Sequence, residues 1–225
     1  MSFDRSKFKK TEAIVLYSQF VLLEFREVGM FLFEMDSVLT SKISDIEDFA
    51  KTMIDSADSE DTRNELIDNL LDERYQLDTT FKQLLFNSSF ISVFAMFENA
   101  IQGVSRHSLG DTFQIRKKDV IVNYRKDIER VFNVELDFGL WTEILLYREA
   151  RNRLVHSSLQ LTKQPESPMR QKLRDFLSNT GFVKFKEDDT FIISNRRFIE
   201  QFCGLAEKYL KNTFNKVVPL VKSSN

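Results

Sequence analysis

The chain has 225 residues, of which 42% are hydrophobic and 29% charged, a composition typical of a globular protein with a sizeable core. It contains only 6 glycines and 3 prolines, which disfavours a β-rich fold and predicts long helices with few connections. Its single cysteine, Cys203, excludes an intramolecular disulfide framework. The N-terminus is polar and basic, and it is not followed by the apolar segment and small-residue cleavage site of a secretory signal in their usual order. Both features predict a cytoplasmic protein.

The net charge of −2 conceals a division along the chain. Residues 1–110 contain 11 basic and 19 acidic side chains, whereas residues 111–225 contain 21 basic and 15 acidic ones. A basic second half fits a protein whose anionic ligand, such as nucleic acid, contacts only that part. The alternative is that these charges are ordinary solvated helix faces.

Two long helices are predicted in the first half of the chain. Apolar residues recur at mostly helical spacings over about Glu12–Met35 and again over about Arg63–Arg106. The repeat of about 3.5 residues in the second helix indicates packing against another long helix, in the same chain or in a partner. The run Asp58–Asp61 is expected to be an exposed connection, with Asp61 or Thr62 as the cap of the helix that follows.

The longest uncharged stretch, residues 83–97, is short and polar for a membrane span. We therefore expect it to be a buried helix, and we expect no contact with a membrane. Cys203 lies in an apolar stretch and is expected to be a buried small side chain.

The second half predicts shorter helices and one hairpin. The expected elements are a break at Ser108–Asp111, helices over about Lys118–Phe132 and Leu140–His156, a helix ending near Ser178, a β-hairpin over Phe182–Ile193, and a final helix that Ser194 or Asn195 caps and Pro219 ends. The fold class is therefore all-α. We expect an antiparallel helical bundle over residues 61–225, with an N-terminal helical arm over residues 1–60 and a small C-terminal β-hairpin.

Polar residues gather on the helix expected over Leu140–His156. Its apolar residues Trp141, Ile144, Leu145 and Val155 define a stripe, and Arg148 and Asn152 fall in line with it because residues 145, 148, 152 and 155 are three or four apart. Two polar side chains on a face predicted to be buried require a reason, and Arg151 and His156 lie beside them.

Arginine and histidine together can cut RNA without a metal. His156 can move protons, while Arg151 can hold the negative charge that gathers on phosphate. Asn152, four residues before His156, can orient the imidazole. Arg151 lies five residues before His156, about 140° around an ideal helix, so the two converge only if the last turn loosens or a second copy supplies one of them. A structural arginine and a histidine at a helix end are the alternative.

Other candidate residues carry weaker signals. Glu98 is in line with Ile91, Phe94 and Ile101, so it is expected to face the bundle interior and pair with Arg148 or Arg151, unless it is an exposed helix acid. His107 is expected to be an ordinary residue at a helix end. The chain has 2 histidines and 1 cysteine, so we expect no metal site.

The pattern Arg151-Asn152-x-x-x-His156, late in a hydrophobic helix, resembles the signature of the HEPN superfamily. The resemblance extends over about Arg63–Val218 in architecture, although the specific match spans only six positions. It implies an antiparallel bundle, a homodimer whose two motifs face each other, and metal-independent RNA cleavage that leaves a 2′,3′-cyclic phosphate. Family toxins paired with a nucleotidyltransferase antitoxin usually have a tyrosine two residues after the histidine, where this chain has Ser158.

The sequence therefore predicts a dimeric endoribonuclease with Arg151, His156 and Asn152 as catalytic residues and Arg148 and Glu98 as supporting residues. It is expected to need no cofactor, to cleave RNA as a toxin or anti-phage effector, and to have an antitoxin or another defence protein as a possible partner. One alternative is a catalytically inactive HEPN-like scaffold or nucleotide-sensing module of a defence complex. Another is a purely structural coiled-coil dimer.

Overall fold

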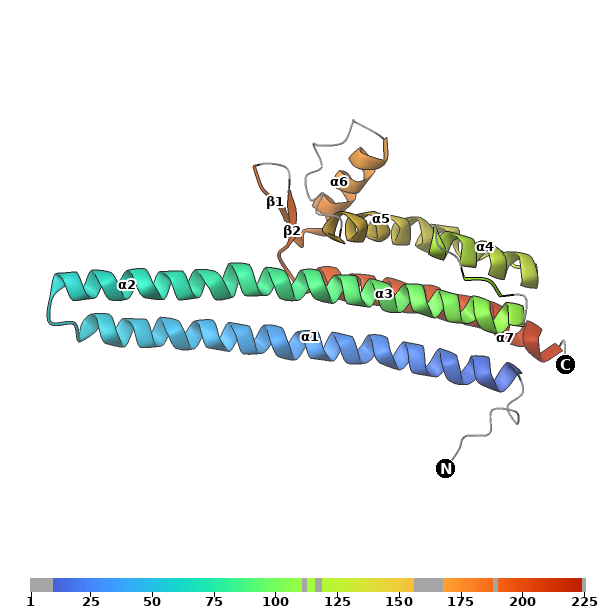
Figure 1. Cartoon of the computed structure of the whole chain (residues 1–225), viewed down its shortest axis with the longest axis horizontal. Coiled ribbons are helices and arrows are strands. Elements are labelled where there is room, and N and C mark those ends of the chain that lie inside the picture. The colour runs from blue at the N-terminus through green and yellow to red at the C-terminus, as the bar shows by residue number, and fades with distance from the viewer. Residues whose placement is uncertain (1–9, 111–112, 116–118, 156–167, 188–189, 224–225) are drawn as a thin grey trace, which may run out of the picture. The chain divides into compact units, whose positions relative to one another are not determined.

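The computed structural model describes residues 10–110, 113–115, 119–155, 168–187 and 190–223. It is an all-α protein with one small two-stranded antiparallel sheet near its C-terminal end, which confirms the predicted fold class (Figure 1). The chain forms two compact units: the first comprises Met1–Val28, Ile91–Val155 and Glu200–Asn225, and the second comprises Gly29–Phe90 and His156–Ile199. Each unit thus combines segments that are far apart in the sequence. The predicted division after residue 60 stays a prediction.

The second unit contains a long helical hairpin. The first helix, α1 (Lys10–Asp55), extends 20 residues beyond the predicted end at Met35. No proline interrupts it, and the hydroxyls of Ser37 and Thr40 donate to carbonyls four residues earlier, at 2.8 Å in both cases. After a short connection, α2 (Glu60–Tyr75) runs back beside the second half of α1, and Arg74 of α2 pairs with Glu47 of α1 at 3.1 Å (Figure 1).

The cap of α2 differs from the prediction. Ser59, and neither Asp61 nor Thr62, is the N-cap: its hydroxyl accepts a hydrogen bond from the Thr62 backbone N–H at 3.2 Å. The prediction was wrong because the helix already begins at Glu60, so the two proposed caps lie inside its first turn.

The helix predicted over Arg63–Arg106 is continuous but changes its winding. A π-helical segment, η2 (Gln76–Phe81), follows α2 and is in turn followed by α3 (Lys82–Leu109). The Lys82 backbone N–H bonds to the carbonyl of Leu77, five residues earlier. Residues after this segment are therefore rotated relative to an uninterrupted α-helix. The helix ends at Leu109, three residues beyond the predicted end near Arg106 and inside the predicted break, before Gly110 with its φ of +55°.

One described helical stretch, Glu60–His107, contains an 18-residue window of mean hydropathy 1.4, apolar and long enough to cross a membrane. This is weak evidence for a span, because the core helix of a soluble protein meets the same criterion. Within residues 83–97 the larger apolar side chains that are buried are Phe86, Phe90, Val93, Phe94 and Phe97. The window itself is 39% buried, so burial of one helix face accounts for part of the same hydropathy.

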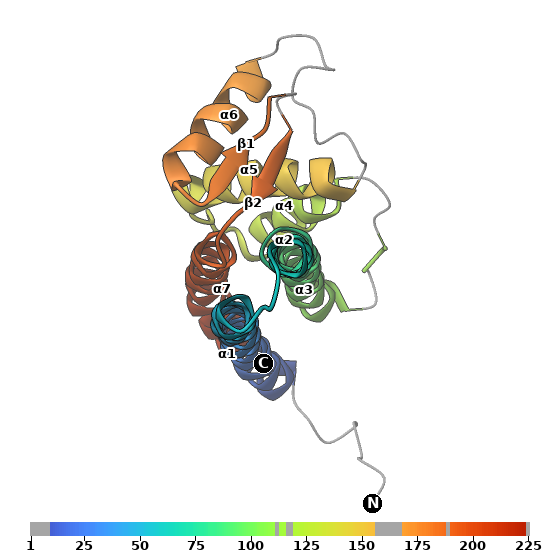
Figure 2. The same ribbon diagram turned by 90° about the vertical axis from the view of Figure 1, so that its left-hand side faces the viewer.

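The predicted hairpin is present in the second unit. Helix α6 (Pro168–Thr180) stops before Gly181, whose φ of +69° favours glycine. The strands β1 (Val183–Phe185) and β2 (Phe191–Ile193) then pair antiparallel, with Val183 opposite Ile193. Figure 2 shows α6 beside this hairpin, and the Arg174 guanidinium lies 5.4 Å from the centre of the Phe185 ring.

The first unit has an aromatic core. It contains parts of α1 and α3, the helices α4 (Val120–Phe132) and α5 (Phe138–Val155), and most of α7 (Arg197–Ser223). The Phe202 ring of α7 stacks on Phe94 at 5.1 Å between centroids and lies 5.9 Å from Phe97 and 5.0 Å from Tyr147. All four rings are buried, so α3, α5 and α7 share one apolar centre.

A buried arginine holds the connection from α4 to α5. Arg125 donates to Glu129 through Nε at 3.0 Å and Nη2 at 2.9 Å, and to the Leu136 carbonyl at 3.1 Å. The same Glu129 oxygen accepts the Leu136 N–H at 3.0 Å, and Asp137 caps α5 by accepting from the Leu140 N–H at 2.9 Å. These bonds determine where α5 begins and therefore how its polar end is placed.

The predicted end of the last helix was wrong. Helix α7 continues through Pro219 to Ser223, although Asn195 accepts from the Arg197 N–H at 2.9 Å near the predicted start. Proline removes one N–H donor and crowds the preceding turn. Only four helical residues follow Pro219, so the missing hydrogen bond weakens only the end of the helix.

We expect Gly103 and Tyr17 to be energetically coupled in a double-mutant cycle. The Tyr17 hydroxyl donates to the Asn99 carbonyl at 3.0 Å, and its ring occupies the space that a Cβ at position 103 would need. In a Tyr17→Ala background, Gly103→Ala should stabilise the protein by about 1 kcal/mol through helix propensity. In the native background this gain should be cancelled, because the ring must move and its hydrogen bond is lost. Urea unfolding of the four proteins measures the coupling, and equal effects in both backgrounds would contradict it.

Cys203 is buried on α7, as predicted, and burial raises the pKa of its thiol to about 12, with Glu200 and Glu207 adding to the shift. The thiol therefore stays protonated at neutral pH, and the thiolate that reacts with disulfides is scarce. We expect Ellman's reagent to modify the native protein far more slowly than the urea-unfolded protein. Rapid, stoichiometric reaction of the native protein would contradict this expectation.

Candidate functional site

The buried face of α5 differs from the predicted stripe. The buried residues recur every third position and are Trp141, Ile144, Tyr147, Ala150 and Arg153. The predicted stripe was right for Trp141 and Ile144 and wrong beyond them: Leu145, Arg148 and Asn152 are only half-buried and Val155 is exposed. A row of residues three apart forms one of the ridges by which helices pack. Part of this buried face is formed by Tyr147 and Ala150. A pattern based on strongly apolar residues misses them, because tyrosine and alanine are only weakly hydrophobic.

Arg151 lies at the edge of this face and is held by three neighbours. Its Nη2 is 3.4 Å from Oε2 of Glu98 on α3. Of the two arginines predicted as partners of Glu98, Arg148 and Arg151, the structure thus pairs it with Arg151. Its Nη1 donates to the Asn152 Oδ1 at 3.2 Å, and its Cζ lies 6.0 Å from the centre of the Phe94 ring. The Arg151 and Glu98 side chains retain 23% and 24% of their exposure, so solvent and solutes still reach the pair.

The other two arginines of α5 have their own carboxylates. Arg148 donates to Asp119, the residue before α4, at 2.8 Å. Arg153 is buried and pairs with Glu149 one turn earlier at 3.1 Å. The charge of Arg148, which the sequence predicts to be a supporting residue, is thus offset by Asp119.

Arg151 is the least tightly paired of the three arginines of α5. Its ion pair is the longest, at 3.4 Å against 2.8 Å and 3.1 Å. Its Nε is buried without a hydrogen-bond partner in the described part of the chain. A guanidinium has five N–H donors in a planar fork, so Arg151 can donate to an additional anionic oxygen while it keeps its hydrogen bond to Asn152.

The predicted histidine cannot be placed against this geometry. Helix α5 ends at Val155, and His156 lies outside the described residues. Asn152 is four residues before it, and its Oδ1 already accepts from Arg151, which leaves its amide N–H₂ as the group for a further partner. The structure therefore brings Arg151, Asn152 and Glu98 together.

The sequence did not predict two residues of this site. Phe94, whose ring lies beside the Arg151 guanidinium, is predicted from sequence only as part of an apolar stripe. Arg153 is not predicted to be buried, although it continues the row of residues three apart that begins at Trp141. The ring of His107, the other histidine, is tilted by 52° against that of Tyr17 with the centroids 5.3 Å apart, and burial and the neighbouring Arg106 lower its pKa. Within the described ranges, no three His, Cys, Asp or Glu side chains converge as a metal site would require.

Comparison with known proteins gives no relative: no family model, no curated protein and no solved structure matches this chain.

Proposed function

We propose that the protein is an HEPN-like, metal-independent endoribonuclease that acts as a homodimer, as a toxin or an anti-phage effector. The observation that supports this most is Arg151, a partly exposed guanidinium with a long ion pair, five residues before His156. Binding a phosphate needs donors on an anchored element, and the Arg125 hydrogen bonds anchor the start of α5.

The proposed reaction uses the substrate's own hydroxyl. His156 takes the proton of a ribose 2′-hydroxyl while that oxygen attacks phosphorus, and the bond from phosphorus to the 5′-oxygen breaks. The leaving 5′-oxygen takes a proton from an imidazolium, supplied by His156 of the second protomer. Arg151 stabilises the negative charge of the phosphorane, and Asn152 orients the arginine. The products are a 2′,3′-cyclic phosphate and a 5′-hydroxyl, and DNA is not cut.

We expect His156→Ala to abolish cleavage of total RNA by the purified protein in the presence of EDTA. His107→Ala is the matched control, because it removes the other histidine, which lies against Tyr17. The wild type and the control should yield fragments with cyclic phosphate ends, and the His156 variant should yield none. Equal cleavage by the wild type and the His156 variant would overturn the assignment. Cleavage that EDTA abolishes would overturn the metal-independent mechanism.

A non-catalytic scaffold is the second candidate, and one observation favours it. Glu98 already opposes the charge of Arg151, and an ion pair between α3 and α5 has a structural use without any substrate. Expression in a bacterial host separates the two proposals. The endoribonuclease should arrest growth unless His156 is replaced, whereas a scaffold should not arrest growth in either form.

A further inference from the structure

The helical hairpin of the second unit leaves unusually many apolar side chains in solvent. We call residues 29–90 the acidic hairpin; it comprises the second half of α1, all of α2 and η2, and the start of α3. Between residues 29 and 80 only Leu32 and Ile46 are buried among the apolar side chains. Large apolar side chains that are 52% to 64% exposed are Met30, Phe31, Phe33, Val38, Phe49, Leu71, Tyr75, Phe81 and Leu84. Exposed apolar groups in this number mark an interaction surface.

These side chains are ordered along the helices. Phe31, Val38 and Phe49 are spaced by 7 and 11 residues, so they lie on one stripe of α1, which is about 27 Å long at 1.5 Å per residue. Met35 and Leu39 of α1 and Phe81, Leu84 and Leu85 of the facing helix line an open groove together with Ser88. The π-helical segment directly precedes Lys82. Its wider turn changes the direction in which the following side chains, including Leu84 and Leu85, point around the helix axis.

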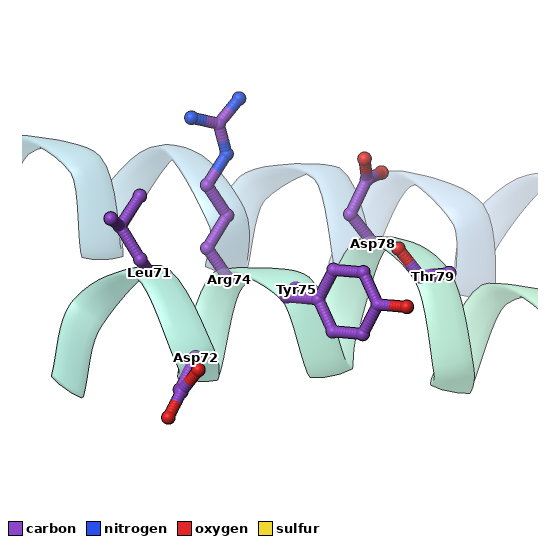
Figure 3. A pocket seen from close by; sticks show the side chains of 6 residues that line it. All are labelled: Leu71, Asp72, Arg74, Tyr75, Asp78 and Thr79. Atoms are coloured by element: carbon purple, nitrogen blue, oxygen red, sulfur yellow. The ribbon is translucent and has the colours of Figure 1, made fainter. Parts of the chain in front are cut away.

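A second hollow adjoins the π-helical segment. It is lined by Leu71, Asp72, Arg74, Tyr75, Asp78 and Thr79. Figure 3 shows Leu71, Arg74 and Asp78 extending to one side of the helix and Asp72 to the other, with the Tyr75 ring between them. An exposed aromatic ring with carboxylates on both sides is a favourable contact for lysine or arginine side chains.

The charge of the acidic hairpin indicates which kind of partner can bind its exposed apolar side chains. The acidic hairpin has 14 acidic and 5 basic side chains, a net −9, and 12 of the acids are exposed. Three of the bases are already paired within the hairpin: Arg74 with Glu47, Lys82 with Asp78, and Lys51 with Asp48. A second copy of the hairpin, a nucleic acid or an anionic membrane would all meet a surface of their own sign.

We propose that the acidic hairpin binds a basic amphipathic helix of a partner protein. The apolar face of that helix lies in the groove between α1 and α3, and its lysine and arginine side chains contact the acids beside the groove. An apolar helix face laid into a groove, with anchors three, four and seven residues apart, is a common mode of recognition. A stripe of about 27 Å accommodates about 18 helical residues. The proposal does not depend on the ribonuclease activity.

The test uses the full chain and a fluorescein-labelled peptide of about 18 residues in which leucine and lysine follow the helical period. Fluorescence anisotropy should report binding that weakens as salt is raised. The double variant Phe81→Ser/Leu84→Ser should bind about tenfold more weakly or worse. Phe138→Ser, at a position on α5 that is 75% exposed and outside the hairpin, is the matched control and should bind as the wild type does. Glu34→Gln/Asp45→Asn should weaken the binding as well.

Four results would overturn the proposal. One is equal binding of a peptide in which glutamate replaces every lysine, and another is equal loss in the Phe138 control. A third is self-association in sedimentation velocity that the Phe81/Leu84 variant abolishes, which would make a second copy the occupant. The fourth is co-sedimentation of the wild type, but not this variant, with phosphatidylcholine vesicles, which would assign the surface to a membrane.

Discussion

Arg151→Ala is expected to lower the rate of RNA cleavage about 10²–10³-fold, the usual cost of removing one donor that stabilises a developing oxyanion. The reason is geometric. The guanidinium that the proposed mechanism uses has the longest ion pair of α5, at 3.4 Å, and its side chain is 23% exposed, so its Nη2 donors can contact the phosphorane. Single-turnover cleavage of a labelled RNA measures the loss. Arg151→Lys should recover little of it, because an ammonium offers no planar fork for two phosphate oxygens.

Arg130→Ala is the matched control for that experiment. Arg130 lies on α4 of the same unit, and its side chain is 72% exposed and bonded to Asp127. Its removal lowers the charge of the unit as Arg151→Ala does, and it should leave cleavage unchanged. Because its partner Asp127 is buried, some loss of stability is expected, which urea unfolding measures. If both arginine variants lose activity equally, the effect is one of general charge, and the specific role of Arg151 fails.

Phe202→Ala is expected to destabilise the first unit by about 3–5 kcal/mol, the range for removal of a buried aromatic side chain. Phe202 contacts Phe94, Phe97 and Tyr147, so its truncation opens a cavity among helices α3, α5 and α7. Urea unfolding followed by circular dichroism measures the change. Because Phe94 also lies beside Arg151, the variant should lose RNA cleavage at temperatures below its own unfolding transition.

Phe138→Ala provides the comparison for that prediction. It removes the same side chain from the start of α5 at a position that is 75% exposed, and it should change the free energy of unfolding by less than about 0.5 kcal/mol. A large effect at Phe138, or a small one at Phe202, would mean that the aromatic cluster is not the core of this unit.

Local signals predicted most elements because each depends on a few neighbouring residues. Asp137 caps α5 through its own carboxylate, Asn195 bonds to the first residue of α7, and Gly181 supplies the positive φ after α6. The errors were of the same local kind: Ser59 replaced the expected caps of α2, and α7 continued through Pro219. A helix start can be taken by any of several adjacent polar residues, and a proline near a helix end costs only part of one turn.

Composition, periodicity and capping residues thus determined by themselves that this protein is all-α, roughly where each helix and strand lies, and that Arg151 and Asn152 stand late on one helix. Only the tertiary structure decided that Glu98, 53 residues earlier, is the partner of Arg151, and that the buried row of α5 passes through Tyr147 and Arg153. It also decided which apolar residues of the acidic hairpin stay in solvent. The physical reason is the sequence separation of the interacting residues. A cap or a turn depends on residues within one helical turn, whereas burial and ion pairing depend on which distant helices pack against each face.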